Sequence, residues 1–148
     1  MAEDRFPELI GSIIQNCGIL EMLTNKAIER LVKDPLLSRK IVTRTFSHRI
    51  KRLCDLLHKR KTLPREDVDS FCKELSEIVP YRNVVAHNPI VTTGTLPGGS
   101  PDSCIEVVRY KLDPPIEKLT EADLQGLLER TRKAIKRFRN SVPEIFQL

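Results

Sequence analysis

Residues 7–32 decide the fold of this chain, and they read PELIGSIIQNCGILEMLTNKAIERLV. Apolar side chains recur there at steps of three and four residues, which is the spacing of one face of an α-helix. Asp34-Pro35 closes the pattern, because a residue before proline avoids the α region. The stretch therefore predicts a helix over 7–32 that packs one apolar stripe against other helices. The stripe consists of Ile10, Ile13, Ile14, Cys17, Leu20, Leu23, Ala27, Ile28 and Leu31.

The same spacing predicts three more helices. One covers 37–59, a second opens at Leu63-Pro64 and extends to residue 87, and a third covers 121–140. Pro80 lies inside the second of these, where a missing N–H and a clash with the preceding turn predict a kink, or a break and a restart. Thr120 is the expected N-cap of the last helix, with Asp123 completing a capping box.

Residues 90–117 have a different character. They begin with the turn-rich segment IVTTGTLPGGSPDS and continue with CIEVVRYKL at 104–112, which is typical of a strand. We interpret 90–117 as a β-hairpin inserted before the last helix. The predicted architecture is one all-α domain over 1–148, a four-helix bundle with a small β-hairpin insertion.

Composition excludes several classes of protein. With 40% hydrophobic and 30% charged residues the chain is globular rather than disordered, and no apolar run is long enough to span a membrane. The acidic N-terminus lacks the basic and apolar regions of a secretory signal. Cys17, Cys54, Cys72 and Cys104 lack metal-ligand spacing, and the first three lie on apolar helix faces. We therefore expect buried free thiols in a reducing cytoplasm, with no metal and no cofactor.

The stretch YRNVVAHNP, residues 81–89, gathers Arg82, Asn83 and His87 within an apolar run. On an α-helix Asn83 and His87 share a face, whereas Arg82 lies about 140° around the axis from His87. Two arrangements would bring Arg82 and His87 together. A bend at Pro80 could redirect the arginine, or a symmetric dimer could pair Arg82 of one copy with His87 of the other.

These three residue types suit metal-independent cleavage of RNA. Attack of a ribose 2′-hydroxyl on the adjacent phosphorus needs a base, an acid and positive charge for the phosphorane. His87 titrates near neutral pH and would act as acid or base. Arg82 would clamp the phosphate, and Asn83 would orient the phosphate or the imidazole. The net charge of +5 fits an anionic partner such as RNA.

The order and spacing of Arg82, Asn83 and His87 resemble the signature of the HEPN (higher eukaryotes and prokaryotes nucleotide-binding) superfamily. In that signature a polar residue follows an arginine, and a histidine comes five to seven positions after the arginine. The resemblance implies a helical bundle and a homodimeric endoribonuclease that needs no metal, often a toxin or a defence effector. Some relatives are toxins held by an antitoxin, which adds an antitoxin or regulatory protein to the implied partners.

Further candidates for RNA contact are Tyr81, Arg52, Arg132 and Lys136, an aromatic residue and three cations on predicted helices. For the cations a solvated helix face is the alternative, and for Tyr81 it is partial burial. For the whole chain the alternative is a non-catalytic HEPN-like module that binds RNA, a nucleotide or a partner protein.

Overall fold

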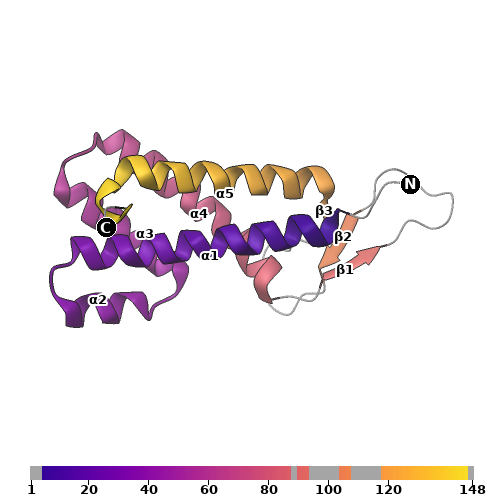
Figure 1. Ribbon diagram of the computed structural model, residues 1–148, viewed down its shortest axis with the longest axis horizontal. Coiled ribbons are helices and arrows are strands. Elements are labelled where there is room, and N and C mark those ends of the chain that lie inside the picture. Colours follow the sequence, from indigo (N-terminus) through magenta and orange to yellow (C-terminus); the bar gives the residue numbers. More distant parts are fainter. Residues whose placement is uncertain (1–4, 88–89, 94–103, 108–117, 147–148) are drawn as a thin grey trace.

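The computed structural model describes residues 5–87, 90–93, 104–107 and 118–146, and most of these residues are helical, as predicted (Figure 1). The elements are α1 (Phe6–Leu31), α2 (Pro35–Val42), α3 (Phe46–Arg60), α4 (Arg65–His87), β1 (Ile90–Thr93), β2 (Cys104–Val107), β3 (Lys118–Thr120), α5 (Glu121–Ser141) and the 3-10 helix η1 (Pro143–Phe146). None of the described helices is both long and apolar enough to cross a bilayer.

The long helices α1, α3, α4 and α5 form a bundle. Figure 1 shows α1 and α5 side by side along the length of the bundle. The small sheet lies at one end of the bundle, and α2 and η1 lie at the other. One cluster of buried side chains joins all five α-helices and includes Leu20, Ile41, Leu53, Phe71 and Phe138. Each large apolar side chain buried in this way stabilises the fold by about 1.5–3 kcal/mol. This core fixes how α1, α3 and α4 face one another.

The predicted helix over 37–59 is wrong in one respect, because the chain forms two helices there, α2 and α3. The interruption lies at 43–45, where Thr45 takes an extended conformation and caps α3. The Thr45 hydroxyl accepts a hydrogen bond from the backbone N–H of His48 at 3.3 Å. This local hydrogen bond competes with a continuous helix, since it satisfies one of the four orphan N–H groups at a helix start.

The region between α4 and α5 contains strands, as predicted, but the expected hairpin is extended by a third strand, β3, which lies beyond the predicted insertion. β1 pairs with β2 and β2 pairs with β3, all antiparallel, which gives a three-stranded sheet in the order β1-β2-β3. The end of the predicted strand, at 108–112, lies outside the described residues, as do residues 94–103 of the turn-rich segment. The capping box of α5 is confirmed, with Thr120 and Asp123 bonded reciprocally at 2.9 and 3.1 Å.

The prediction of free cysteines holds for Cys17, which is a buried thiol. It is wrong for Cys54 and Cys72, which form a disulfide between α3 and α4 with their Cα atoms 6.1 Å apart. α3 and α4 follow each other in the chain and pack side by side. Cys54 and Cys72 are both half-buried, and they meet where the two helices are in contact. The side chain of Cys104 lies outside the part of the chain that the structure describes.

Candidate functional site

Arg82, Asn83 and His87 all lie on the last turns of α4. This helix is continuous through Pro80, so of the two predicted outcomes, a kink or a break with a restart, the break does not occur. Pro80 and Ser76 are both exposed, and water can therefore satisfy the Ser76 carbonyl that the proline leaves without a helical donor. The backbone of His87 ends α4, and its side chain lies outside what the structure describes.

The Arg82 side chain turns towards α1, where it meets Glu21. Arg82 Nη2 donates to both carboxylate oxygens, at 2.9 Å to Oε1 and 3.0 Å to Oε2. Arg82 Nη1 donates to Asn83 Oδ1 at 3.0 Å. The side chains of Arg82 and Glu21 are each only 21% exposed, so their attraction is less screened than that of a surface pair. The guanidinium of Arg82 is therefore held in one orientation.

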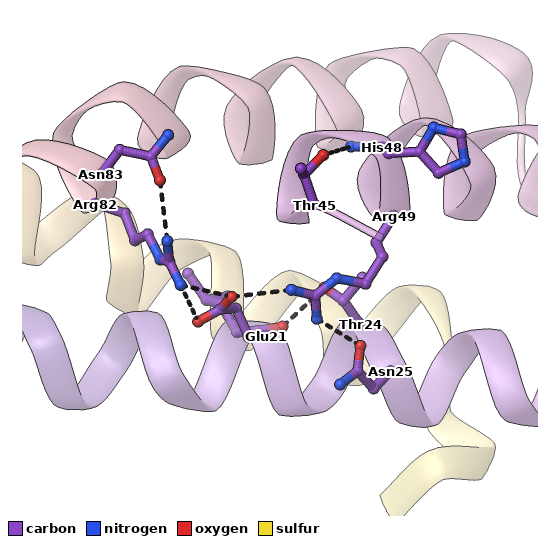
Figure 2. Close-up of polar contacts among 9 residues, drawn as sticks. Glu21, Thr24, Asn25, Thr45, His48, Arg49, Arg82 and Asn83 are labelled. Carbon is purple, nitrogen blue, oxygen red and sulfur yellow. Dashed lines mark hydrogen bonds and ion pairs between the residues drawn. The ribbon is translucent and has the colours of Figure 1, made fainter. Parts of the chain in front are cut away.

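Arg49 of α3 shares the same carboxylate. Its Nη2 donates to Glu21 Oε1 at 3.0 Å, and its Nη1 donates to Asn25 Oδ1 at 2.7 Å. Figure 2 shows the two guanidinium groups reaching Glu21 from its two sides. The guanidinium of Arg49 also lies 5.4 Å from the ring centre of Phe46, within cation–π range. The Glu21 carboxylate thus joins three helices, α1, α3 and α4. Together, Glu21, Arg49 and Arg82 carry a formal net charge of +1.

A cavity of about 190 Å³ opens beside this network. Its lining combines the charged pair with apolar residues of α1 and α4, namely Ile13, Ile14, Cys17, Gly18, Glu21, Arg82 and Val85. The Arg82–Glu21 pair therefore lies at a cavity wall rather than in the closed core. A cavity of this size admits one small group, such as a phosphate or part of a sugar.

Cys17 lines this cavity but is not a nucleophile at neutral pH. Burial raises the pKa of its thiol to about 11, the Arg82 guanidinium lowers that pKa, and the Glu21 carboxylate adds to the rise. A reactive cysteine needs its thiolate, which this environment disfavours. Cys17 is therefore not a candidate nucleophile for a reaction in this cavity.

The other predicted RNA contacts do not line this cavity in the described part of the chain. None of Tyr81, Arg52, Arg132 and Lys136 is among the described residues that line the cavity beside Arg82. Tyr81 is half-buried and lines a separate hollow together with residues of α5. Arg52 is half-buried on α3, whereas Arg132 and Lys136 are exposed on α5. The structure thus does not place these four residues at the cavity that Arg82 and Glu21 line.

Sequence reasoning missed Glu21, Asn25 and Arg49. The sequence feature that could have revealed this network was Arg49, which falls within a mainly apolar stripe of α3. A half-buried guanidinium there needs an acceptor, since burying an unpaired charge is costly. No three His, Cys, Asp or Glu side chains gather into a group that could hold a metal ion in the described part of the chain.

No family model, curated protein or solved structure matches this chain.

Proposed function

We propose that this chain is a metal-independent endoribonuclease of the HEPN type, with a HEPN-like four-helix core, that acts as a homodimer. The observation that carries the proposal is the placement of Arg82. Its guanidinium is fixed by Glu21 and Asn83 at a cavity wall, on the helix that ends at His87. A fixed guanidinium fits a tetrahedral phosphate and loses little entropy on binding it.

The proposed reaction gives every motif residue a role and uses one His87 from each copy of the dimer. One His87 imidazole takes the proton of the ribose 2′-hydroxyl, and the 2′-oxygen attacks the adjacent phosphorus. Arg82 and Asn83 stabilise the charge that develops on the phosphorane oxygens. The bond from phosphorus to the 5′-oxygen then breaks, and a second imidazole supplies the proton to that leaving oxygen. The products are a 2′,3′-cyclic phosphate and a 5′-hydroxyl end.

The surface of α1 supports the homodimer. Ile14 and Met22 lie two turns apart on α1 with side chains 47% and 46% exposed, and exposed Gly18 lies between them. Ile14 and Gly18 also line the cavity that contains Arg82. Two copies related by a two-fold axis would cover this apolar strip and bring two motifs to one cleft. Each cleft would then hold two histidines, one for each proton transfer.

The test is cleavage of RNA in the presence of EDTA. The wild-type protein should cut single-stranded RNA of mixed sequence, and His87→Ala should lose about 10²–10⁴-fold in rate, the usual worth of general acid–base catalysis. His48→Ala is the matched control, because His48 is exposed on α3. Circular dichroism should show the same helical content in all three proteins. A folded His87→Ala variant that cuts RNA at the wild-type rate would refute the assignment.

A second candidate is a non-catalytic module that binds RNA, a nucleotide or a partner protein. The ion pair between Arg82 and Glu21 favours it, because the arginine is already engaged within its own chain. This candidate predicts that RNA stays intact in EDTA. It also predicts that His87→Ala binds RNA as tightly as the wild type.

A further inference from the structure

The carboxylate of Glu21 is built into the site from two directions. It accepts from Arg82 through both oxygens, and from Arg49 through Oε1. Arg49 is in turn fixed by Asn25, which accepts a hydrogen bond from Arg49 Nη1 at 2.7 Å. Glu21 is therefore held by a second, fixed arginine as well as by Arg82. The carboxylate is thereby restrained, and a restrained partner fixes the direction of the Arg82 guanidinium.

Stability alone is a weak reason for this arrangement. A partly buried ion pair gains little net stability, because desolvation of the two charges offsets most of their attraction. Glu21 and Arg82 also face the cavity, whereas the closed core of the bundle is almost wholly apolar. An ion pair at a cavity wall can do what an ion pair in the core cannot: it orients a charged side chain towards a ligand that enters the cavity.

We propose that Glu21 is a positioning residue, which holds Arg82 in the orientation that stabilises the transition state of RNA cleavage. This inference rests on the proposed function. Arg49 acts one step further out, because it holds Glu21. Neither Glu21 nor Arg49 needs to touch the RNA for this role.

The role predicts opposite effects on binding and on turnover. Glu21→Gln keeps the shape of the side chain and one carbonyl acceptor but removes the negative charge. The variant gains positive charge beside Arg82, so it should bind the RNA backbone a few-fold more tightly. Its Arg82 loses the fixed orientation, so the cleavage rate should fall by about 10–100-fold, as for other groups that orient a primary contact. A purely structural residue would not strengthen binding while it weakens turnover.

The experiment compares wild type, Glu21→Gln and Glu29→Gln. Glu29 is the matched control, because it is exposed on the same helix and its change alters the net charge equally. Single-turnover cleavage in EDTA gives the rate, and fluorescence anisotropy with 2′-O-methyl RNA, which cannot be cleaved, gives the affinity. Arg49→Gln is the second variant, and it should lower the rate less than Glu21→Gln does. Urea melts establish that each variant is folded.

The outcomes separate this inference from the proposed function. Slower cleavage with tighter binding in Glu21→Gln, and wild-type behaviour in Glu29→Gln, is the expected result. If wild type cuts RNA, His87→Ala does not, and folded Glu21→Gln keeps the wild-type rate, the positioning role is wrong while the nuclease stands. If wild type leaves RNA intact, both proposals fall. If Glu21→Gln lowers rate and affinity together, Glu21 is a structural residue and the inference is overturned.

Discussion

Lys61 ends α3 in a conformation that favours glycine. Its φ is 56° and its ψ is 22°, in the left-handed region, and it is the one described non-glycine residue with a positive φ. The left-handed conformation costs an L-residue about 1–2 kcal/mol because Cβ approaches the carbonyl oxygen. Glycine at the same place after a helix avoids that cost. The chain therefore carries a local strain that one substitution can remove.

Lys61→Gly should raise the free energy of unfolding by about 0.5–1 kcal/mol, because part of the relief is offset by the greater freedom of glycine in the unfolded chain. Lys51→Gly is the matched control, since Lys51 is exposed in the interior of α3 and glycine there should cost about 1 kcal/mol. Urea denaturation followed by circular dichroism measures both. Equal losses in the two variants would show that Lys61 is unstrained.

Arg82 and Asn83 were singled out from the sequence, but Glu21, which holds Arg82, was not. Arg82 and Asn83 stand next to each other, whereas Glu21 precedes Arg82 by 61 positions and lies on another helix. Arg49 indicated that a buried acceptor was needed. The chain has 20 acidic residues, and only the packing of α1 against α3 and α4 selects Glu21 from among them.

At the scale of elements, periodicity predicted the long helices because each one buries a stripe in a common core. It missed the interruption between α2 and α3, because Thr45 fits an apolar stripe and an N-cap equally well. Pro80 does not break α4, because its exposed position lets water replace the lost helical bond. Periodicity also missed the pairing of Cys54 with Cys72, since spacing alone does not reveal which half-buried cysteines meet.

The disulfide between α3 and α4 should stabilise the bundle by about 3 kcal/mol, because it closes a loop of 18 residues in the unfolded chain. Replacing both Cys54 and Cys72 by serine should lower the free energy of unfolding by about this amount. Adding a reductant to the wild type should have the same effect, and adding it to the double variant should change nothing. A wild-type protein whose free energy of unfolding is the same with and without the reductant would contradict the prediction.

At the scale of the whole molecule, the proposed homodimer would form through the exposed strip of Ile14, Gly18 and Met22 beside the cavity. Ile14→Asp should shift the protein from dimer to monomer, because burying an unpaired carboxylate at an apolar contact is costly. Light scattering after size exclusion measures the mass. Leu36→Asp is the matched control, since Leu36 is 71% exposed on α2, away from the cavity.

A monomeric Ile14→Asp variant should also lose RNA cleavage, because each cleft would then hold one histidine in place of two. A wild-type protein that stays monomeric at all concentrations would contradict the homodimer. A dimer that survives Ile14→Asp but not Leu36→Asp would place the contact on α2 instead.

The chemistry of the site is tested most directly by the ends of the RNA fragments produced in EDTA. Attack by the neighbouring 2′-hydroxyl, with His87 moving the protons and Arg82 stabilising the phosphorane, predicts fragments with 2′,3′-cyclic phosphate and 5′-hydroxyl ends, identified by mass spectrometry. Fragments with 3′-hydroxyl and 5′-phosphate ends, which arise when water attacks instead, would contradict the account, as would RNA that stays intact.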